Sequence, residues 1–141
     1  MQRDPLSALL KLHRLSVDRA RRDLAEHLQA ERQAEAALHQ AGAELHQQAT
    51  EAGHLAQNAG YADAFALWLP RGQAAVQASR DAVARAEAAT ASARTTLGRL
   101  RAAARATEDL IGRRRAAKAL TLARKEEAVL DEAGQWRGGT G

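Results

Sequence analysis

The chain has 141 residues, no cysteine, a formal net charge of +4 and an aromatic content of only 3%. The missing cysteines exclude disulfides and thiolate chemistry, and so few bulky side chains cannot fill the core of a globular domain. Ala, Leu, Glu, Gln and Arg dominate instead, which favours long helices whose buried area lies along a seam.

A first helix is predicted over about residues 5–57. Asp4-Pro5 is a typical helix start, because Asp can cap the free amides and Pro at the first helical position loses no hydrogen bond. Two rows of residues then recur at seven-residue intervals, which is typical of a two-helix coiled coil. The strong row is Leu10, Val17, Leu24, Glu31, Leu38, Leu45 and Ala52, and the companion row is His13, Ala20, His27, Ala34, Ala41, Gln48 and Leu55.

Helix-breaking residues gather between Gly53 and Gly72, where Gly60 and Pro70 also lie. We therefore predict a tip at about residues 58–64, with the chain folding back near Gly60. Asn58 and Asp63 can cap or turn the backbone there.

Three aromatic side chains, Tyr61, Phe65 and Trp68, cluster at this tip and are called the tip aromatics. One interpretation is that they close the loop by packing on Ala52 and Leu55. The other is that one or two of them are exposed as a contact patch, because a tip has little core in which to bury them.

The second helix is predicted over about residues 65–134 and repeats the two rows. Its strong row is Leu69, Val76, Val83, Thr90, Leu97, Ala104 and Ile111, and its companion row is Phe65, Gly72, Ser79, Ala86, Ala93, Leu100 and Thr107. In an antiparallel pair the strong rows meet as Leu10/Ile111, Val17/Ala104, Leu24/Leu97, Glu31/Thr90, Leu38/Val83, Leu45/Val76 and Ala52/Leu69. A shift by one heptad would place the charge of Glu31 against an aliphatic side chain. The prediction is a single all-α domain, residues 1–141, folded as a long two-helix antiparallel coiled-coil hairpin.

The second helix outruns the first. From Arg113 to about Ala133 it has no intramolecular partner except the few residues before Leu10, and its apolar face makes it a candidate docking segment. The tail, residues 138–141, is expected to be disordered.

Charge is unevenly distributed along the chain. Residues 2–57 sum to −1, whereas residues 64–137 sum to +6. The basic run from Arg94 to Lys118 is either a solvated face with helical salt bridges or a surface that attracts an acidic partner. Nucleic acid is not the expected partner, because no aromatic residue interleaves the arginines.

Enzymatic motifs are absent from the sequence, so we expect no catalytic residue, no cofactor and no metal. His39 and His46 share a helix face but lie two turns, or roughly 10 Å, apart, which is too far for one metal without other ligands. No apolar stretch is typical of a signal peptide or a membrane span, so we expect a soluble cytoplasmic protein without membrane insertion.

The organisation of the chain resembles that of the FliJ family, the stalk proteins of flagellar type III export. The resemblance covers nearly the whole chain and includes a long heptad helix and a central Trp68-Leu69. The similar segments are Pro5-Leu6-Ser7-Ala8-Leu9-Leu10-Lys11-Leu12, Arg113-Arg114-Arg115-Ala116-Ala117-Lys118-Ala119-Leu120 and Lys125-Glu126-Glu127-Ala128-Val129-Leu130-Asp131-Glu132. The stalk of virulence type III secretion systems is similar by the same criterion.

This resemblance implies a noncatalytic monomeric hairpin like the central stalk of rotary ATPases. Its paired ends would enter the hexameric export ATPase, its tip would reach toward the membrane-embedded export gate, and it would bind export chaperones at the cytoplasmic face of the inner membrane. The tip contact would be made by the tip aromatics. The ATPase-facing end would consist of Leu6, Leu9, Leu10, Arg113, Arg114, Arg115, Lys118, Leu120, Leu122, Arg124 and Lys125.

Two alternatives remain open at this point. The chain could be a structural or scaffolding coiled coil whose partner is another helix, or, as a weaker alternative, a basic coiled coil associated with nucleic acid. A stable parallel dimer would exclude the hairpin and the stalk together.

Overall fold

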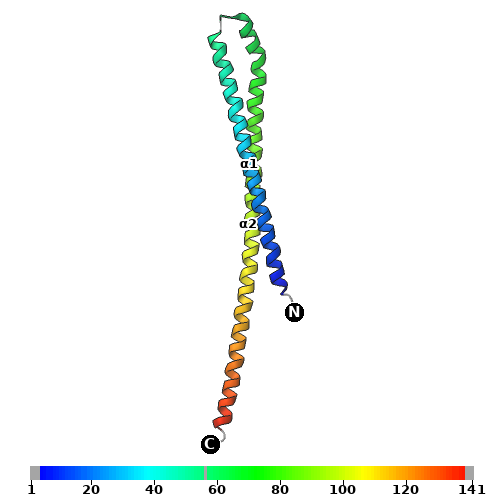
Figure 1. Cartoon of the computed structure of the whole chain (residues 1–141), viewed down its shortest axis with the longest axis vertical. Coiled ribbons are helices and arrows are strands. Elements are labelled where there is room, and N and C mark those ends of the chain that lie inside the picture. The colour runs from blue at the N-terminus through cyan, green and yellow to red at the C-terminus, as the bar shows by residue number, and fades with distance from the viewer. Residues whose placement is uncertain (1–3, 56, 139–141) are drawn as a thin grey trace. The chain divides into compact units, whose positions relative to one another are not determined.

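The structure, a computed structural model, describes residues 4–55 and 57–138, which form two long helices (Figure 1). Helix α1 spans Pro5–His54 and helix α2 spans Ala59–Gly138. The helices pack against each other as an antiparallel pair, and no strand occurs among these residues, so the predicted all-α helical hairpin is confirmed. Neither helix, over its described length, contains an apolar stretch that could cross a membrane.

The chain divides into two compact units. The hairpin unit spans Asp18–Gly98 and contains the turn between the helices, whereas the terminal unit combines Met1–Val17 with Arg99–Gly141. Each unit thus pairs a segment of α1 with a segment of α2. The tip belongs to the hairpin unit and both chain ends belong to the terminal unit.

The seam between the helices consists of the rows that the sequence predicts. Every residue of these rows is buried or half-buried except Leu55, which is 45% exposed. Thr90 is the most deeply buried side chain, and Leu97 and Val76 are buried in the same unit. The terminal unit buries Val17 from α1 and, from α2, Ala104, Thr107 and Ile111. Small and β-branched side chains make this seam narrow.

Two grooves support the predicted register. His27 and Ala93 line one groove in the hairpin unit, and Leu10 and Ile111 line another in the terminal unit. In the layer of Glu31 and Thr90, the Thr90 hydroxyl donates to the carbonyl oxygen of His27, at 3.4 Å. A buried hydroxyl needs a hydrogen-bond acceptor, and here a nearby backbone carbonyl supplies it, so the carboxylate of Glu31 can stay solvated.

The tip is shorter than the sequence predicts. Helix α1 ends at His54, not near residue 57, and α2 begins at Ala59, not near residue 65. The reason is that Asn58 caps α2: its Oδ1 accepts the N–H of Tyr61 at 3.4 Å, and its carbonyl accepts the N–H of Ala62 at 3.1 Å. Gly60, near which the sequence predicts the fold-back, is therefore already helical.

Two other expectations about the ends of α2 also differ. Pro70 lies inside the helix without ending it, although proline removes a backbone donor and its ring crowds the carbonyl four residues earlier. At the far end α2 continues to Gly138, beyond the predicted end near residue 134. Of the tail expected to be disordered, residues 139–141 lie outside the described residues.

A cysteine pair tests the register in the hairpin unit. Leu38 and Val83 are both half-buried seam residues, and the chain has no natural cysteine. Leu38→Cys combined with Val83→Cys is expected to form a disulfide rapidly, because paired seam positions bring Cα atoms within about 7 Å. Gel mobility under non-reducing conditions measures the bond. Leu45→Cys with Val83→Cys, displaced by one heptad, is the control that should remain reduced, and the reverse result would disprove the register.

Candidate functional site

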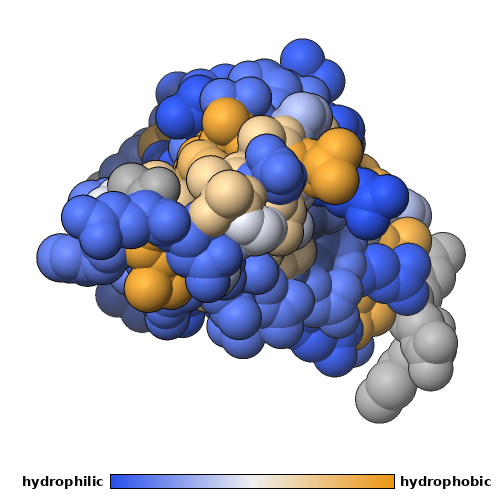
Figure 2. Space-filling model, turned by 90° about the horizontal axis from the view of Figure 1, so that it is seen from above, coloured by the Kyte–Doolittle hydropathy of each residue, from blue (hydrophilic) through white to orange (hydrophobic). Residues whose placement is uncertain are grey.

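The tip aromatics are half-buried, so neither interpretation of them is complete. The phenol of Tyr61 donates to Glu51 Oε2 at 2.9 Å, and the rings of Phe65 and Trp68 lie with centroids 6.2 Å apart. The most exposed apolar side chain here is Leu67, at 80%. In the view onto the tip, pale atoms gather in the middle of the face, orange atoms lie in separate places around them, and blue hydrophilic atoms cover most of the rest (Figure 2).

The sequence did not reveal the roles of two residues at the tip, Glu51 and Gly72. Glu51 accepts the hydrogen bond of Tyr61, and Gly72 makes room for Trp68, whose ring lies only 2.5 Å from the position that a Cβ at Gly72 would occupy. The sequence spacing could have predicted the contact between Trp68 and Gly72, because residues one helical turn apart are neighbours on the helix surface. No spacing rule predicts the hydrogen bond from Tyr61 to Glu51, because it crosses from α2 to α1 at the turn.

Tyr61 reports on the tip through its titration. The hydrogen bond to Glu51, burial and the negative charge of Glu51 together raise the pKa of Tyr61 above its usual 10.0. The folded state favours the neutral phenol, so the contribution of this contact to stability is present below pH 10 and is lost as pH rises through the raised pKa. Because Tyr61 is the only tyrosine, tyrosinate absorbance follows this one group.

We expect Glu51→Ala to lower the pH at which tyrosinate absorbance appears, back toward the ordinary value of about 10. Glu44→Ala removes an exposed acid from the same helix and is the matched control, for which no change is expected. Equal shifts in the two variants would show that net charge, and not the hydrogen bond, sets the pKa of Tyr61.

The start of α1 determines which leucines of the ATPase-facing end meet α2. Asp4 Oδ1 accepts the N–H of Leu6 at 3.1 Å, and its carbonyl accepts the N–H of Ser7 at 3.1 Å, so Asp4 caps the helix as predicted. Leu6 and Leu10 are half-buried, whereas Leu9 is 41% exposed. Two of the three leucines therefore belong to the seam.

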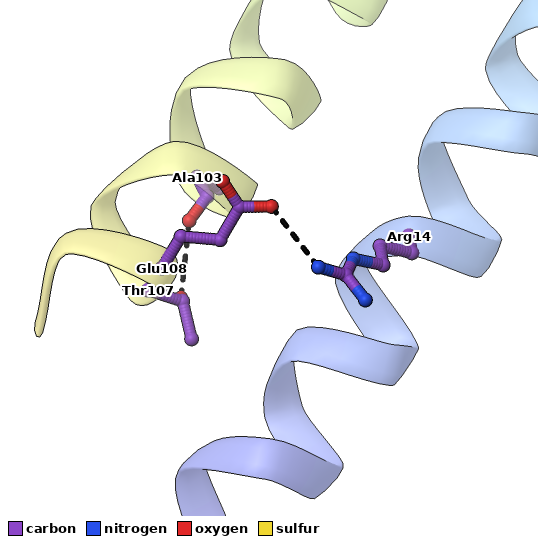
Figure 3. A network of polar contacts seen from close by, with 4 residues as sticks. All are labelled: Arg14, Ala103, Thr107 and Glu108. Atoms are coloured by element: carbon purple, nitrogen blue, oxygen red, sulfur yellow. Dashed lines mark hydrogen bonds and ion pairs between the residues drawn. The ribbon is translucent and has the colours of Figure 1, made fainter. Parts of the chain in front are cut away.

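A cationic groove of about 430 Å³ lies in the terminal unit, between the first turns of α1 and residues 108–115 of α2. Across it, Arg14 Nη2 lies 3.3 Å from Glu108 Oε1 (Figure 3). Both side chains are about half exposed, so this pair contributes roughly 0–1 kcal/mol to stability. The groove is lined by Ser7, Leu10, Lys11, Arg14, Glu108, Ile111, Gly112 and Arg115.

Of the predicted ATPase-facing residues, the structure brings Leu10 and Arg115 together in this groove. It adds Lys11 and Arg14, which the sequence analysis missed. The predicted register contains the signal for Arg14, because it places position 14 opposite Thr107 and hence beside Glu108.

The remaining predicted residues lie on the part of α2 that follows the seam. Every described residue after Ile111 is exposed, and we call residues 112–138 the overhang. It carries the predicted Arg113, Arg114, Lys118, Leu120, Leu122, Arg124 and Lys125. The structure does not gather these side chains into a pocket, but leaves them along one exposed helix.

One acidic cluster lies elsewhere, in the hairpin unit. Carboxylate oxygens of Glu31, Glu35 and Glu87 lie within 4.8 Å of one another, and none of the three side chains is buried. Neighbouring like charges destabilise a helix pair, and nothing besides this proximity points to a metal ion. His39 and His46 are exposed and do not belong to the cluster.

Comparison with known proteins places the chain in a family. No curated protein and no solved structure matches it. A model of the family described as flagellar FliJ protein matches residues 1–139, nearly the whole chain, and these residues include both helices. The chain therefore belongs to the FliJ family and is a component of the flagellar export apparatus.

Proposed function

We propose that this protein is a noncatalytic stalk of the flagellar export apparatus, whose terminal unit enters the hexameric export ATPase. The observation that carries the proposal is the exposed basic helix that begins where the seam ends. Ile111 is the last buried residue, and Arg113, Arg114 and Arg115 follow it directly. None of these arginines has an ion pair among the described residues.

Unpaired, solvated cations at the end of a helix pair suit an acidic partner. They raise the association rate through electrostatic attraction and fix orientation, and they cost little because they remain near solvent. The groove at Lys11, Arg14 and Arg115 extends this positive surface onto α1. An acidic collar at the mouth of the ATPase ring is the matching surface.

The tip, in the hairpin unit, supports the second half of the proposal. The tip presents Leu67, 80% exposed, beside the half-buried tip aromatics, and exposed apolar side chains next to aromatic rings suit a docking site. We propose that it contacts the export gate, and that export chaperones bind the same hairpin at the cytoplasmic face of the inner membrane.

Charge reversal tests the ATPase role. Arg113→Glu, Arg114→Glu and Arg115→Glu together are expected to raise the stalk concentration needed for half-maximal stimulation of the purified export ATPase by about tenfold or more. The physical reason is repulsion between the new carboxylates and an acidic collar. Phosphate release measures the stimulation, and circular dichroism checks that helicity is unchanged.

The matched control reverses three exposed arginines of α2 in the hairpin unit, Arg80, Arg85 and Arg94. It makes the same change in net charge, so unchanged stimulation is expected. If both triple variants lose stimulation equally, net charge explains the effect and the proposed insertion of the terminal unit is wrong.

A further inference from the structure

The apolar face of α2 that forms the seam of the terminal unit continues along the helix after Ile111, where α1 no longer covers it. Leu122 follows Ile111 by eleven residues, which is three helical turns, so the two side chains lie on the same face of α2. Val129 and Trp136 continue this row at seven-residue intervals. Ile111 is 9% exposed, but Leu122, Val129 and Trp136 are 59%, 64% and 79% exposed. The overhang therefore presents a continuation of an established helix interface with no helix on it.

The charge of the overhang reverses at one point. Residues 113–125 carry six cations and no acid, whereas residues 126–132 carry four acids and no cation. The reversal falls between Lys125 and Glu126. A second copy laid antiparallel across this junction would set each basic half against an acidic half, while a parallel copy would set like charges side by side.

The apolar row has the same centre as the charge reversal. Leu122 and Val129 lie equally far from the junction of Lys125 and Glu126, on opposite sides of it, and so do Arg115 and Trp136. An antiparallel pair centred here places Leu122 on Val129 of the other copy, and the guanidinium of Arg115 on the indole of Trp136. Such an interface is self-complementary and closes under twofold symmetry.

We propose that the overhang docks on the overhang of a second copy of this chain, antiparallel, about an axis at Lys125 and Glu126. The centre of the interface is an apolar groove of about 440 Å³ lined by Leu122, Lys125, Glu126, Val129 and Leu130. The hairpin of each copy stays intact in this pair. The inference does not rest on the ATPase role, although the same face could not serve both partners at once.

The full chain in low salt provides the first test. Sedimentation equilibrium should show the apparent mass rise from 15.1 kDa toward twice that value as concentration increases. Because opposite charges hold the halves together, the dimer should weaken by about tenfold or more between about 0.05 M and 0.5 M salt. A mass of 15.1 kDa at every concentration would show that the overhang does not bind a second copy, and would overturn the proposal. Assemblies larger than a dimer would overturn the twofold interface.

Two single charge reversals make the test specific. Lys125→Glu replaces two Lys–Glu contacts of the dimer by two Glu–Glu contacts, and Glu126→Lys replaces them by two Lys–Lys contacts. Each variant alone should dimerise about tenfold more weakly, whereas an equimolar mixture should recover the native affinity, because each acidic pair then faces a basic pair. Arg85→Glu and Glu87→Lys in the hairpin unit are the controls without effect. A mixture that stays as weak as the single variants would contradict the axis.

Cysteine cross-linking measures direction independently of charge. A mixture of Leu122→Cys chains and Val129→Cys chains should form the mixed disulfide on mild oxidation, while neither variant should cross-link efficiently to itself. Self-linking of Leu122→Cys would show a parallel pair and overturn the proposal. Circular dichroism of each variant checks that the helices remain folded.

Discussion

Replacing Leu97 by alanine is expected to lower the free energy of unfolding by about 2–4 kcal/mol, because a buried leucine loses both its transfer energy and its packing partners. Leu97 is 5% exposed in the hairpin unit. Its neighbours in the strong row of α2, Thr90 and Ala104, are small or β-branched, so neither can fill the space. A narrow seam depends strongly on its few large members.

Urea unfolding followed by circular dichroism measures this loss. The matched control is Leu67→Ala, the same change in the same helix at a side chain that is 80% exposed. There we expect a change within about 0.5 kcal/mol, since little apolar surface returns to water. Equal destabilisation in the two variants would mean that helix propensity, and not burial in the seam, dominates the stability of α2.

The heptad rows were predictable because a two-helix seam leaves little freedom. A side chain at every third or fourth position must face the partner helix, so the spacing alone identifies Val17, Leu97 and Ile111 as interior. The direction of pairing followed from the breakers between the rows. What could not be predicted was the hydroxyl of Thr90, because its choice between His27 and Glu31 depends on side-chain rotation and local solvation.

The tip shows where breaker residues mislead. Pro70 and Gly72 lower helix propensity, but packing along the seam outweighs a local cost of about 1–3 kcal/mol. From the sequence, Asn58 and Asp63 are equally able to cap or turn the backbone, and Gly60 is the predicted centre of the fold-back. The capping bonds of Asn58 determine where α2 begins, and they make the turn short.

The candidate site also has one part that was predictable from the sequence and one part that was not. The exposure of the overhang was predictable, because α2 has more residues than α1 can cover. The groove that adds Lys11 and Arg14 was not, since it depends on how the first turns of α1 lie against Glu108 and Gly112. The heptad register predicts which residues of α1 and α2 lie at the same height along the helix pair. It does not predict which of their side chains line the same groove.

Two glycines of α2 are expected to respond oppositely to the same substitution. Gly98→Ala should stabilise the protein by about 1 kcal/mol, because Gly98 is exposed within the helix and an added Cβ meets nothing within 4 Å. Gly72→Ala should instead destabilise it by about 1–2 kcal/mol, because the gain in helix propensity is offset by overpacking. A Cβ at Gly72 would stand 2.5 Å from Cη2 of Trp68.

The indole must therefore move, and the movement is measurable. Trp68 contacts Phe65 and lies over the buried Gly72, so displacing it exposes the ring and should shift its fluorescence to longer wavelength. A Trp136→Phe background leaves Trp68 as the only tryptophan and removes the signal of the overhang. Gly98→Ala in that background should leave the spectrum unchanged. If Gly72→Ala stabilises the chain as much as Gly98→Ala does, with no spectral shift, Trp68 is not held over Gly72, and the half-buried tip aromatics are free to rearrange when a partner binds.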